Sequence, residues 1–250
     1  MISLSEIPTK APEGFNKEDS KRKTDRMARR IGDLQHVLFA EKKHSLLVIL
    51  QGMDASGKDG ATRKVFSYCT PTGINAYAFR KPTEEEFAHD FLWRIHRQAP
   101  AKGHIKIFIR SHYEDILIQR VHHWIDEDRV KERMEAINRW EMNLLKDNNT
   151  TILKFYMHIS KERQQVKLQE RIDDPRKQWK HNADDWKERE LWDDYMKCYE
   201  YAFRESEIPW IAAPCDKRWY RDYFIAEKVL ETLESLNMKL PTFADKSSHP

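Results

Sequence analysis

The stretch Leu46-Leu-Val-Ile-Leu-Gln-Gly-Met-Asp-Ala-Ser-Gly-Lys-Asp-Gly60 decides the fold of this chain. Its apolar start, Leu46 to Leu50, is typical of a buried parallel strand, and its end predicts a helix from Asp59 to about Tyr68. The turn between them reads G-x-x-x-x-G-K, the pattern of a phosphate-binding loop. Such a loop binds phosphate because backbone N–H groups point inward, the helix adds its positive dipole end, and Lys58 reaches the terminal phosphates.

Two carboxylates depart from the usual loop pattern. Asp59 stands where most such loops have the Ser or Thr that binds magnesium, and Asp54 lies inside the loop. Carboxylates beside phosphates repel them unless divalent cations lie between. We therefore expect Mg²⁺, with Mn²⁺ as a second candidate ion, at this loop. The phosphate-binding candidates here are Gly52, Met53, Ala55, Ser56, Gly57, Lys58, Asp59 and Gly60.

Length and composition limit the classes of function. The chain has 250 residues, enough for one α/β domain with a sizeable core. Charged residues make up 34% of it, yet the net charge is only +3, so no broad basic face for nucleic acid is predicted. No apolar run is long enough to span a membrane, and Met1-Ile-Ser-Leu-Ser-Glu6 lacks the features of a signal peptide. We expect a cytoplasmic protein without a membrane or nucleic-acid partner, in which Cys69, Cys198 and Cys215 are reduced thiols.

Strands alternate with helices along the chain, which predicts an α/β fold: a mainly parallel five-stranded sheet between two helical layers. We expect an arm over 1–23, a phosphate-loop domain over 24–240 and a tail over 241–250. Asn16-Lys-Glu-Asp19 matches the guanine-reading motif of GTPases, but no buried strand precedes it, so we discount it. The expected strands after the first are 75–79, 105–109, 151–159 and 210–213. Before the first strand we expect an amphipathic helix whose apolar face carries Met27, Ile31, Leu34 and Leu38. A second helix should be opened by a capping box at Thr83-Glu-Glu-Glu86 and carry Phe87, Phe91 and Ile95 on one face. Further helices are expected over 129–148, 184–205 and 219–236, and the last of these should bury Tyr223, Leu230 and Leu233.

Charged side chains follow the third strand, at the edge where open α/β sheets bind ligands. Arg110 is a candidate clamp for the charge of the transition state, and Glu114 or Asp115 is a candidate magnesium ligand. The competing interpretations are a structural salt bridge at Arg110 and an acidic first turn of a helix at Glu114 and Asp115.

A basic segment follows the fourth strand. Ser160 is expected to cap its first helix, and residues 161–190 are predicted to form a helical lid over phosphates. A solvated helix face is the competing interpretation of these cations. Tryptophans and tyrosines between Trp186 and Tyr201 are expected in the core or between subunits, which favours a homo-oligomer. The cations are Arg171, Arg176, Lys177, Lys180 and Arg189.

Several segments, in this order, resemble the second family of polyphosphate kinases. They are Gly52-Met-Asp-Ala-Ser-Gly-Lys-Asp-Gly60, Phe91-Leu-Trp-Arg-Ile-His96, Arg110-Ser-His-Tyr-Glu-Asp115, and Trp179-Lys180 with Trp192-Asp-Asp-Tyr195 and Pro209-Trp210. The resemblance runs from about Met27 to Leu236. It implies a thymidylate-kinase-like phosphate-loop fold that moves the terminal phosphate of inorganic polyphosphate onto a nucleoside mono- or diphosphate, or back from a triphosphate, with magnesium.

The resemblance also implies roles for residues. Asp54, Lys58, Arg110 and Glu114 correspond to catalytic positions, and Asp54, Asp59 and Glu114 to metal-binding ones. We add Lys81 and Arg94 to the phosphate- or nucleotide-binding candidates, beside Arg171, Lys180 and Arg189 of the lid. Ile109 departs from some relatives, which have an acid or asparagine before the arginine, so the metal depends on Glu114 and the loop carboxylates.

Two other functions stay open at this point. An ATP-dependent nucleoside monophosphate kinase would have the same fold, but Asp59 and the long basic lid favour an inorganic polyanion as the donor. A polyphosphate- or nucleotide-binding protein without turnover is the second alternative. Transfer in line without a covalent intermediate is expected, because the nucleophile is already a phosphate oxygen.

Overall fold

The computed structural model describes residues 3–243, and its centre is a five-stranded sheet in the order β2-β3-β1-β4-β5. Every neighbouring pair of strands in it is parallel, which confirms the predicted sheet. The strands are β1 (Ser45–Gln51), β2 (Ile74–Ala78), β3 (Ile105–Ile109), β4 (Thr150–His158) and β5 (Trp210–Pro214).

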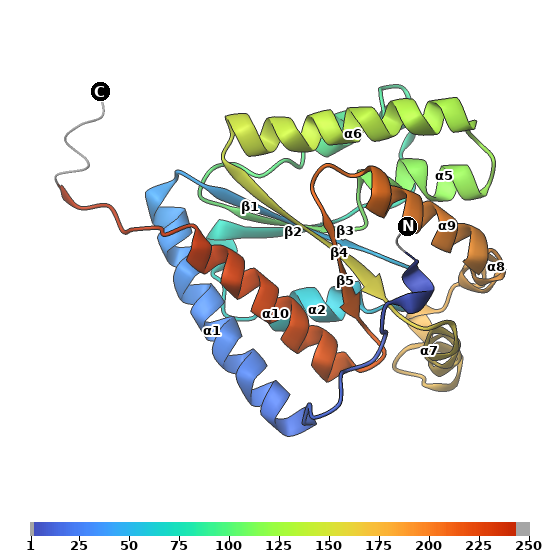
Figure 1. Ribbon diagram of the computed structural model, residues 1–250, viewed down its shortest axis with the longest axis horizontal. Helices are drawn as coiled ribbons and strands as arrows, with labels where there is room; N and C mark the ends of the chain where they lie inside the picture. Colours follow the sequence, from blue (N-terminus) through green and yellow to red (C-terminus); the bar gives the residue numbers. More distant parts are fainter. Residues whose placement is uncertain (1–2, 244–250) are drawn as a thin grey trace.

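The three layers are visible in Figure 1. Helices α1 (Lys17–Glu41), α2 (Lys58–Val65) and α10 (Arg218–Ser235) lie on one face of the sheet, and α5 (Ile118–Val121), α6 (Glu127–Asp147) and α9 (Trp192–Glu205) lie on the other. The remaining helices are α3 (Glu84–Phe87), α4 (Trp93–His96), α7 (Lys161–Asp173) and α8 (Asp184–Glu190), with short 3₁₀ turns η1 (Leu4–Glu6), η2 (Pro71–Gly73), η3 (His112–Ile116) and η4 (Gln178–Lys180). The expected α/β/α architecture is confirmed. None of the helices within residues 3–243 is both long and apolar enough to cross a membrane.

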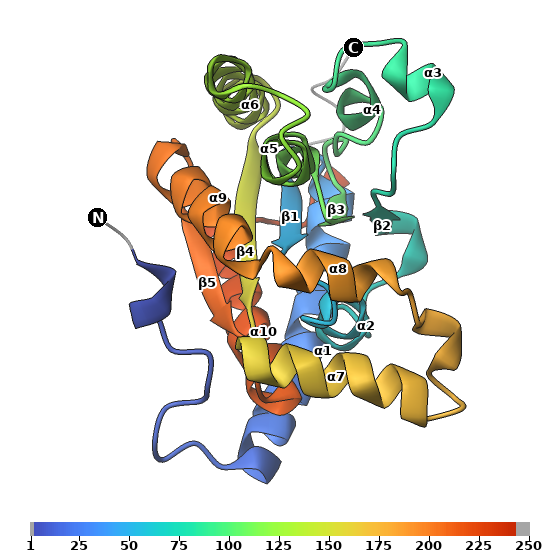
Figure 2. The same cartoon turned by 90° about the vertical axis from the view of Figure 1, so that its right-hand side faces the viewer.

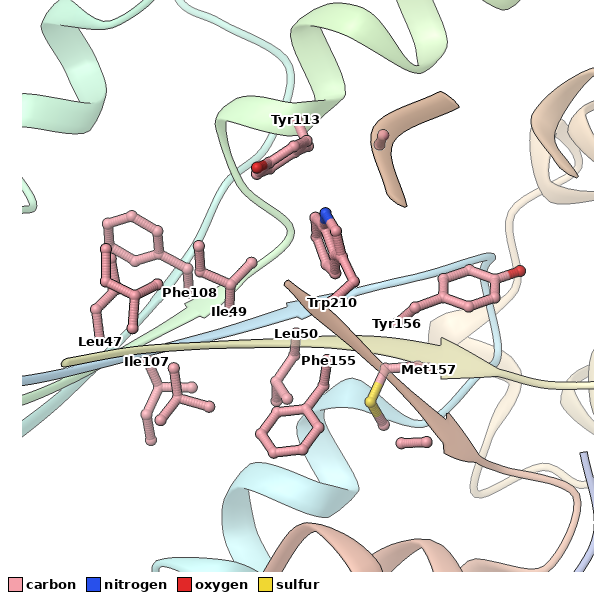
Figure 3. Close-up of a cluster of buried hydrophobic side chains, with 14 of the residues drawn as sticks. Leu47, Ile49, Leu50, Ile107, Phe108, Tyr113, Phe155, Tyr156, Met157 and Trp210 are labelled. Atoms are coloured by element: carbon pink, nitrogen blue, oxygen red, sulfur yellow. The ribbon is translucent and has the colours of Figure 1, made fainter. Parts of the chain in front are cut away.

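Strand β1 is buried along its whole length because helices cover both of its faces. Its Val48 lies beside Ile107 of β3 and Leu153 of β4. Side chains of these strands point alternately into two apolar layers, and Figure 3 shows Phe108 and Ile49 above the sheet and Phe155 below it. The apolar run that predicted a buried strand therefore forms the middle of the core.

The connection that leaves β1 runs to the edge strand β2, whereas the later connections run the other way across the sheet, to β4 and β5. Strands β2 and β3 lie on one side of β1 and β4 and β5 on the other. In open α/β sheets, such a switch point leaves a crevice at the carboxyl ends of the strands. The loop after β1 opens into this crevice.

The N-terminal arm predicted over 1–23 is wrong in extent. Helix α1 begins at Lys17, and the side chain of Asn16 caps it by accepting from the N–H groups of Glu18 and Asp19. The residues that match a GTPase motif thus form a helix N-terminus. The segment before them is also attached, because Leu4 is buried and its N–H donates to Glu200.

Two predicted helices are each broken in two. The capping box at Thr83 and Glu86 is present, but α3 ends at Phe87, whose side chain is exposed. The carboxylate of Asp90 then accepts from the N–H of Leu92, a local bond that competes with helix continuation. The helix predicted over 184–205 breaks at Leu191, between α8 and α9.

The other predicted elements lie within a few residues of their expected bounds. The predicted range 161–190 contains α7, η4 and α8, and Ser160 caps α7 through the N–H of Arg163. In the last helix Leu233 is buried as expected, but Tyr223 and Leu230 are only partly buried. Of the predicted tail, residues 244–250 lie outside the described part of the chain.

Candidate active site

The phosphate loop connects β1 directly to α2. Ala55 and Gly57 have positive φ angles of 63° and 98°, so the backbone turns sharply enough to wrap an anion. The Nζ of Lys58 donates to the carbonyl oxygens of Gly52 (2.7 Å) and Met53 (3.2 Å). Burial lowers the pKa of Lys58, although the charge of Asp54 opposes that shift. The lysine is therefore held across the loop by these two hydrogen bonds, and a bound phosphate would favour its charged form.

Asp54 and Arg110 form an ion pair across the crevice. The Nη2 of Arg110 lies 2.6 Å from Oδ1 of Asp54. Burial alone would raise the pKa of Asp54, but the charges of Lys58 and Arg110 outweigh it and hold that pKa below its usual value. Arg110 has a φ of 61°, and an arginine adopts this left-handed conformation only where its surroundings impose it. The predicted loop carboxylate and strand-end arginine are thus in direct contact.

Glu114 reaches the same region through a buried glutamine. The side-chain amide of Gln51, the last residue of β1, donates to Glu114, and the hydroxyl of Ser111 donates to Gln51 at 3.1 Å. This network joins the end of β1 to the segment after β3. It leaves Glu114 half-buried beside the crevice, whereas the buried Asp115 pairs with Arg94 at 3.6 Å.

Helix α7 lies against the loop. The side chain of Gln164 donates to the carbonyl oxygen of Asp54 at 3.1 Å, and Nζ of Lys167 donates to that of Ala55 at 3.3 Å. Figure 2 shows α7 and α8 in front of α2, at the edge of the sheet where the strands end. Arg189 of α8 donates to the carbonyl oxygen of Lys161 at 2.6 Å, so the two helices are joined to each other.

A cavity of about 730 Å³ lies between the loop, α7, η4 and the start of α10. Eleven basic and four acidic side chains contribute to its wall, so it is a site for a polyanion. The basic ones are Lys58, Arg63, Lys64, Arg163, Lys167, Arg171, Arg176, Lys177, Lys180, Arg218 and Arg221, and the acidic ones are Asp54, Asp59, Glu170 and Asp222.

About half of the predicted site residues line this cavity, and the others, including Arg110 and Glu114, do not. Arg94 is buried elsewhere: its guanidinium donates to the carbonyl oxygen of Arg80 and pairs with Glu86 and Asp115. Lys81 is exposed and does not line the cavity. Arg189 does not line it either. Those in the wall are Asp54, Ala55, Gly57, Lys58, Asp59, Gly60, Arg171, Arg176, Lys177 and Lys180.

Sequence analysis missed the contribution of α10. Arg218 and Arg221 lie in its first turn, at the carboxyl end of β5, and both line the cavity. The signal was present, because Asp216-Lys-Arg-Trp-Tyr-Arg221 follows the predicted strand 210–213 after two intervening residues. Arg163 and Lys167 of α7, which the sequence analysis does not single out, also line the cavity.

The aromatic residues near the lid are used inside the fold. Trp192, Tyr195 and Tyr199 of α9 are buried, and the ring of Tyr199 lies 4.5 Å from that of Tyr156 in β4. The sequence argument for an aromatic subunit interface over this stretch therefore no longer holds for these three residues.

The donor set suits a hard divalent cation. Asp54 and Asp59 supply carboxylate oxygens to one cavity, while residues 3–243 contain no group of three or more His, Cys, Asp or Glu residues that could hold a metal ion. Mg²⁺ keeps several waters and binds through one or two carboxylates together with substrate phosphates. A site with two carboxylates in a phosphate-binding cavity fits that mode.

A phosphate loop at the switch point of a parallel sheet, next to a strand-end arginine and a basic helical lid, defines a phosphate-loop kinase. The family model described as Polyphosphate kinase 2 (PPK2) matches residues 14–241, nearly the whole chain. The chain therefore belongs to the polyphosphate kinase 2 family and is a kinase.

Individual relatives agree with this assignment. The AMP/ADP-polyphosphate phosphotransferase of Meiothermus ruber is 46% identical over 216 residues, which cover 85% of this chain and 80% of that protein. The ADP-polyphosphate phosphotransferase of Rhodopseudomonas palustris is 37% identical, covering 96% and 88%. The crystal structure of polyphosphate kinase 2 from Arthrobacter aurescens TC1 superposes with a TM-score of 0.93 at 40% identity, covering 96% of this chain and 88% of that one.

Proposed function

We propose that this protein transfers the terminal phosphate of inorganic polyphosphate to AMP or ADP, and transfers phosphate back from the nucleoside triphosphate. The observation that carries the proposal is the basic cavity that meets the phosphate loop. A flexible line of phosphates needs cations along its whole length, whereas a nucleotide donor also needs a site for its base. An ATP-dependent kinase is accordingly not favoured, and family membership points the same way.

Positioning and charge neutralisation supply most of the catalysis in phosphoryl transfer. Lys58 leaves its carbonyl partners for the oxygens of the transferring phosphate. Arg110 exchanges its contact with Asp54 for the equatorial oxygens, where charge develops. The acceptor phosphate attacks in line and the shortened polyphosphate leaves, so no covalent intermediate with the protein is needed.

A divalent cation is part of the proposal, with Mg²⁺ the first choice and Mn²⁺ the second. Asp54 and Asp59 would hold it, with Glu114 nearby through Gln51. When bound, it would neutralise charge between donor and acceptor phosphates. Asp54 becomes free for this role once Arg110 has turned to the substrate.

The test supplies long-chain polyphosphate as the only donor, with Mg²⁺ and either AMP or ADP, and follows nucleotide phosphorylation. We expect product with at least one acceptor and none after chelation of the metal. The Lys58→Met variant should keep its fold by circular dichroism and lose turnover by about 10³-fold or more. Absence of product with adenine and guanine acceptors alike would refute the proposal, and full activity of the lysine variant would exclude the loop as the site.

A homo-oligomer and a cytoplasmic location remain predictions. The mass of the protein in solution tests the first of these.

The alternative function, an ATP-dependent nucleoside monophosphate kinase, would be supported if ATP served as the donor while polyphosphate neither reacted nor inhibited.

A further inference from the structure

Arg221 is the most deeply buried cation in the wall of the cavity, with only 2% of its surface exposed. It lies in the first turn of α10, far from the phosphate loop in sequence. Its guanidinium nevertheless reaches the loop, because α10 packs beside α2. Burying an arginine lowers the stability of a protein unless ion pairs and hydrogen bonds compensate for the lost hydration of its charge. The contacts of Arg221 therefore need an explanation.

The guanidinium fills the space beside two glycines of the loop and of α2. A Cβ atom at Gly57 would lie 1.9 Å from Nη1 of Arg221, and one at Gly60 would lie 3.1 Å from Nη2. No side chain other than hydrogen fits at Gly57 while the arginine is there. These two glycines therefore leave room for the guanidinium of Arg221, and Gly57 also allows the turn of the loop.

Asp222 keeps the guanidinium in this place. Its Oδ1 accepts from Nε of Arg221 at 2.9 Å and also from Nη2. Burial raises the pKa of Asp222, whereas the positive charge of Arg221 lowers it, so the two side chains interact as a buried ion pair. Two hydrogen bonds to one carboxylate fix the plane of the guanidinium.

We infer that Arg221 is a positioning residue for phosphoryl transfer: wedged between α10 and the loop, it fixes the loop backbone and Lys58 relative to the donor phosphates. The inference rests on the proposed function, because it assigns the wedge to the donor side of that reaction. Gly57 is the residue before Lys58, so a shift of the loop at Gly57 moves the lysine directly. On this assignment, Arg221 acts on the donor and not on the acceptor nucleotide.

The decisive variant is Arg221→Met combined with Asp222→Asn, which removes the guanidinium without leaving a charged carboxylate unpaired. We expect kcat to fall by about tenfold or more, because misplacing a reacting group by a fraction of an ångström has effects of this order. Affinity for inorganic tripolyphosphate, measured by calorimetry without turnover, should fall with it. The KM for the nucleotide and the melting temperature should stay near those of the unchanged protein.

The matched control is Lys228→Met with Glu231→Gln, which neutralises an exposed ion pair (2.8 Å) on the same helix. It should change none of these quantities. Arg221→Lys should recover part of kcat, since the charge stays while the planar fork is lost. Gly60→Ala should lower kcat on its own. The same substitution should lower kcat less in the Arg221→Lys variant, where the added methyl group has room.

The inference is overturned if the double variant keeps both its kcat and its tripolyphosphate affinity, or if it loses nucleotide and tripolyphosphate binding equally. A wild-type protein that binds tripolyphosphate but transfers no phosphate from polyphosphate would overturn the proposed function instead. In that case the calorimetric comparison still decides whether Arg221 positions the loop.

Discussion

Lys167 is partly buried and lies near several other positive charges. Its Nζ donates to the carbonyl oxygen of Ala55, and the cations of Arg221, Arg163 and Arg218 surround it. Burial first, and then these neighbours, lower the pKa of Lys167 to about 8. Below that pH the amine is charged and attracts a polyanion. Above it the amine is neutral, so binding of the donor should weaken as the pH rises through 8.

The KM for polyphosphate should therefore rise by about tenfold between pH 7 and pH 9, since a hydrogen bond to a charged group is worth roughly 1.5 to 3 kcal/mol. The KM for the nucleotide should change less. Lys167→Arg stays charged throughout this range and should remove the inflection near pH 8. An identical inflection in that variant would assign the titration to another group or to the substrate. Steady-state kinetics across the pH range measures both curves.

Residue roles were predictable where they depend on neighbours in sequence. Lys58 and Asp54 follow from the loop pattern, and Arg110 from its place after a strand. Arg94 and Arg221 were not predictable in this way. Their charges are alike in sequence, but one is used in a buried pair with Asp115 and the other against the loop. Only the packing of distant helices distinguishes them.

Asp216 connects α7, α10 and the N-terminal segment, and the first two of these line the cavity. Its carboxylate accepts from the N–H and hydroxyl of Ser160, at 2.8 and 3.0 Å, and from the hydroxyl of Thr9 at 2.9 Å. Ser160 caps α7, and Asp216 itself lies just before α10. The N-terminal segment is joined in too, since the N–H of Asp216 donates to the carbonyl oxygen of Thr9. One side chain thus sets where α7 begins relative to α10.

Asp216→Asn should weaken this junction, because an amide keeps one acceptor oxygen and brings N–H donors toward other donors. We expect a loss of about 2 kcal/mol in the free energy of unfolding and a higher KM for polyphosphate, since α7 carries Gln164 and Lys167 onto the loop. Thr9→Val removes only one of the three bonds and should have a smaller effect on both. Equal effects of the two variants would contradict this account. Denaturant titrations and donor kinetics measure the two quantities.

A helix could be predicted from the sequence where a regular spacing of apolar residues and a single capping residue define it. Helix α6 runs over Glu127–Asp147, close to the predicted 129–148, and it buries Val130, Met134 and Ile137. The helix predicted after Thr83 failed because Asp90 bonds locally to the N–H of Leu92. A periodic pattern of apolar residues continued past that point, so periodicity alone gave no sign of the break.

The whole molecule carries a net charge of only +3, yet its charges are unevenly placed. Eleven cations and four carboxylates line one cavity, so the rest of the chain contains slightly more acidic than basic residues. The field that attracts a polyanion is therefore local to the crevice at the strand ends. Net charge, the quantity that the sequence makes plain, could not reveal this concentration. It depends on α7, η4 and α10 meeting at one edge of the sheet.

Donor binding should consequently depend on salt far more than acceptor binding. By analogy with single-stranded nucleic acid, each neutralised phosphate contributes about 0.7 to the slope of log affinity against log salt concentration, so about four contacts give a slope near −3. The affinity for AMP or ADP, which carry fewer phosphates, should show a slope nearer −1. Kinetics between low and moderate salt measures both slopes. Neutralising Arg163 and Arg218 together should flatten the donor slope and leave the acceptor slope unchanged. Equal slopes for donor and acceptor would mean that the basic cavity does not hold the polyphosphate, because a site with this many cations cannot bind a line of phosphates without releasing their counterions.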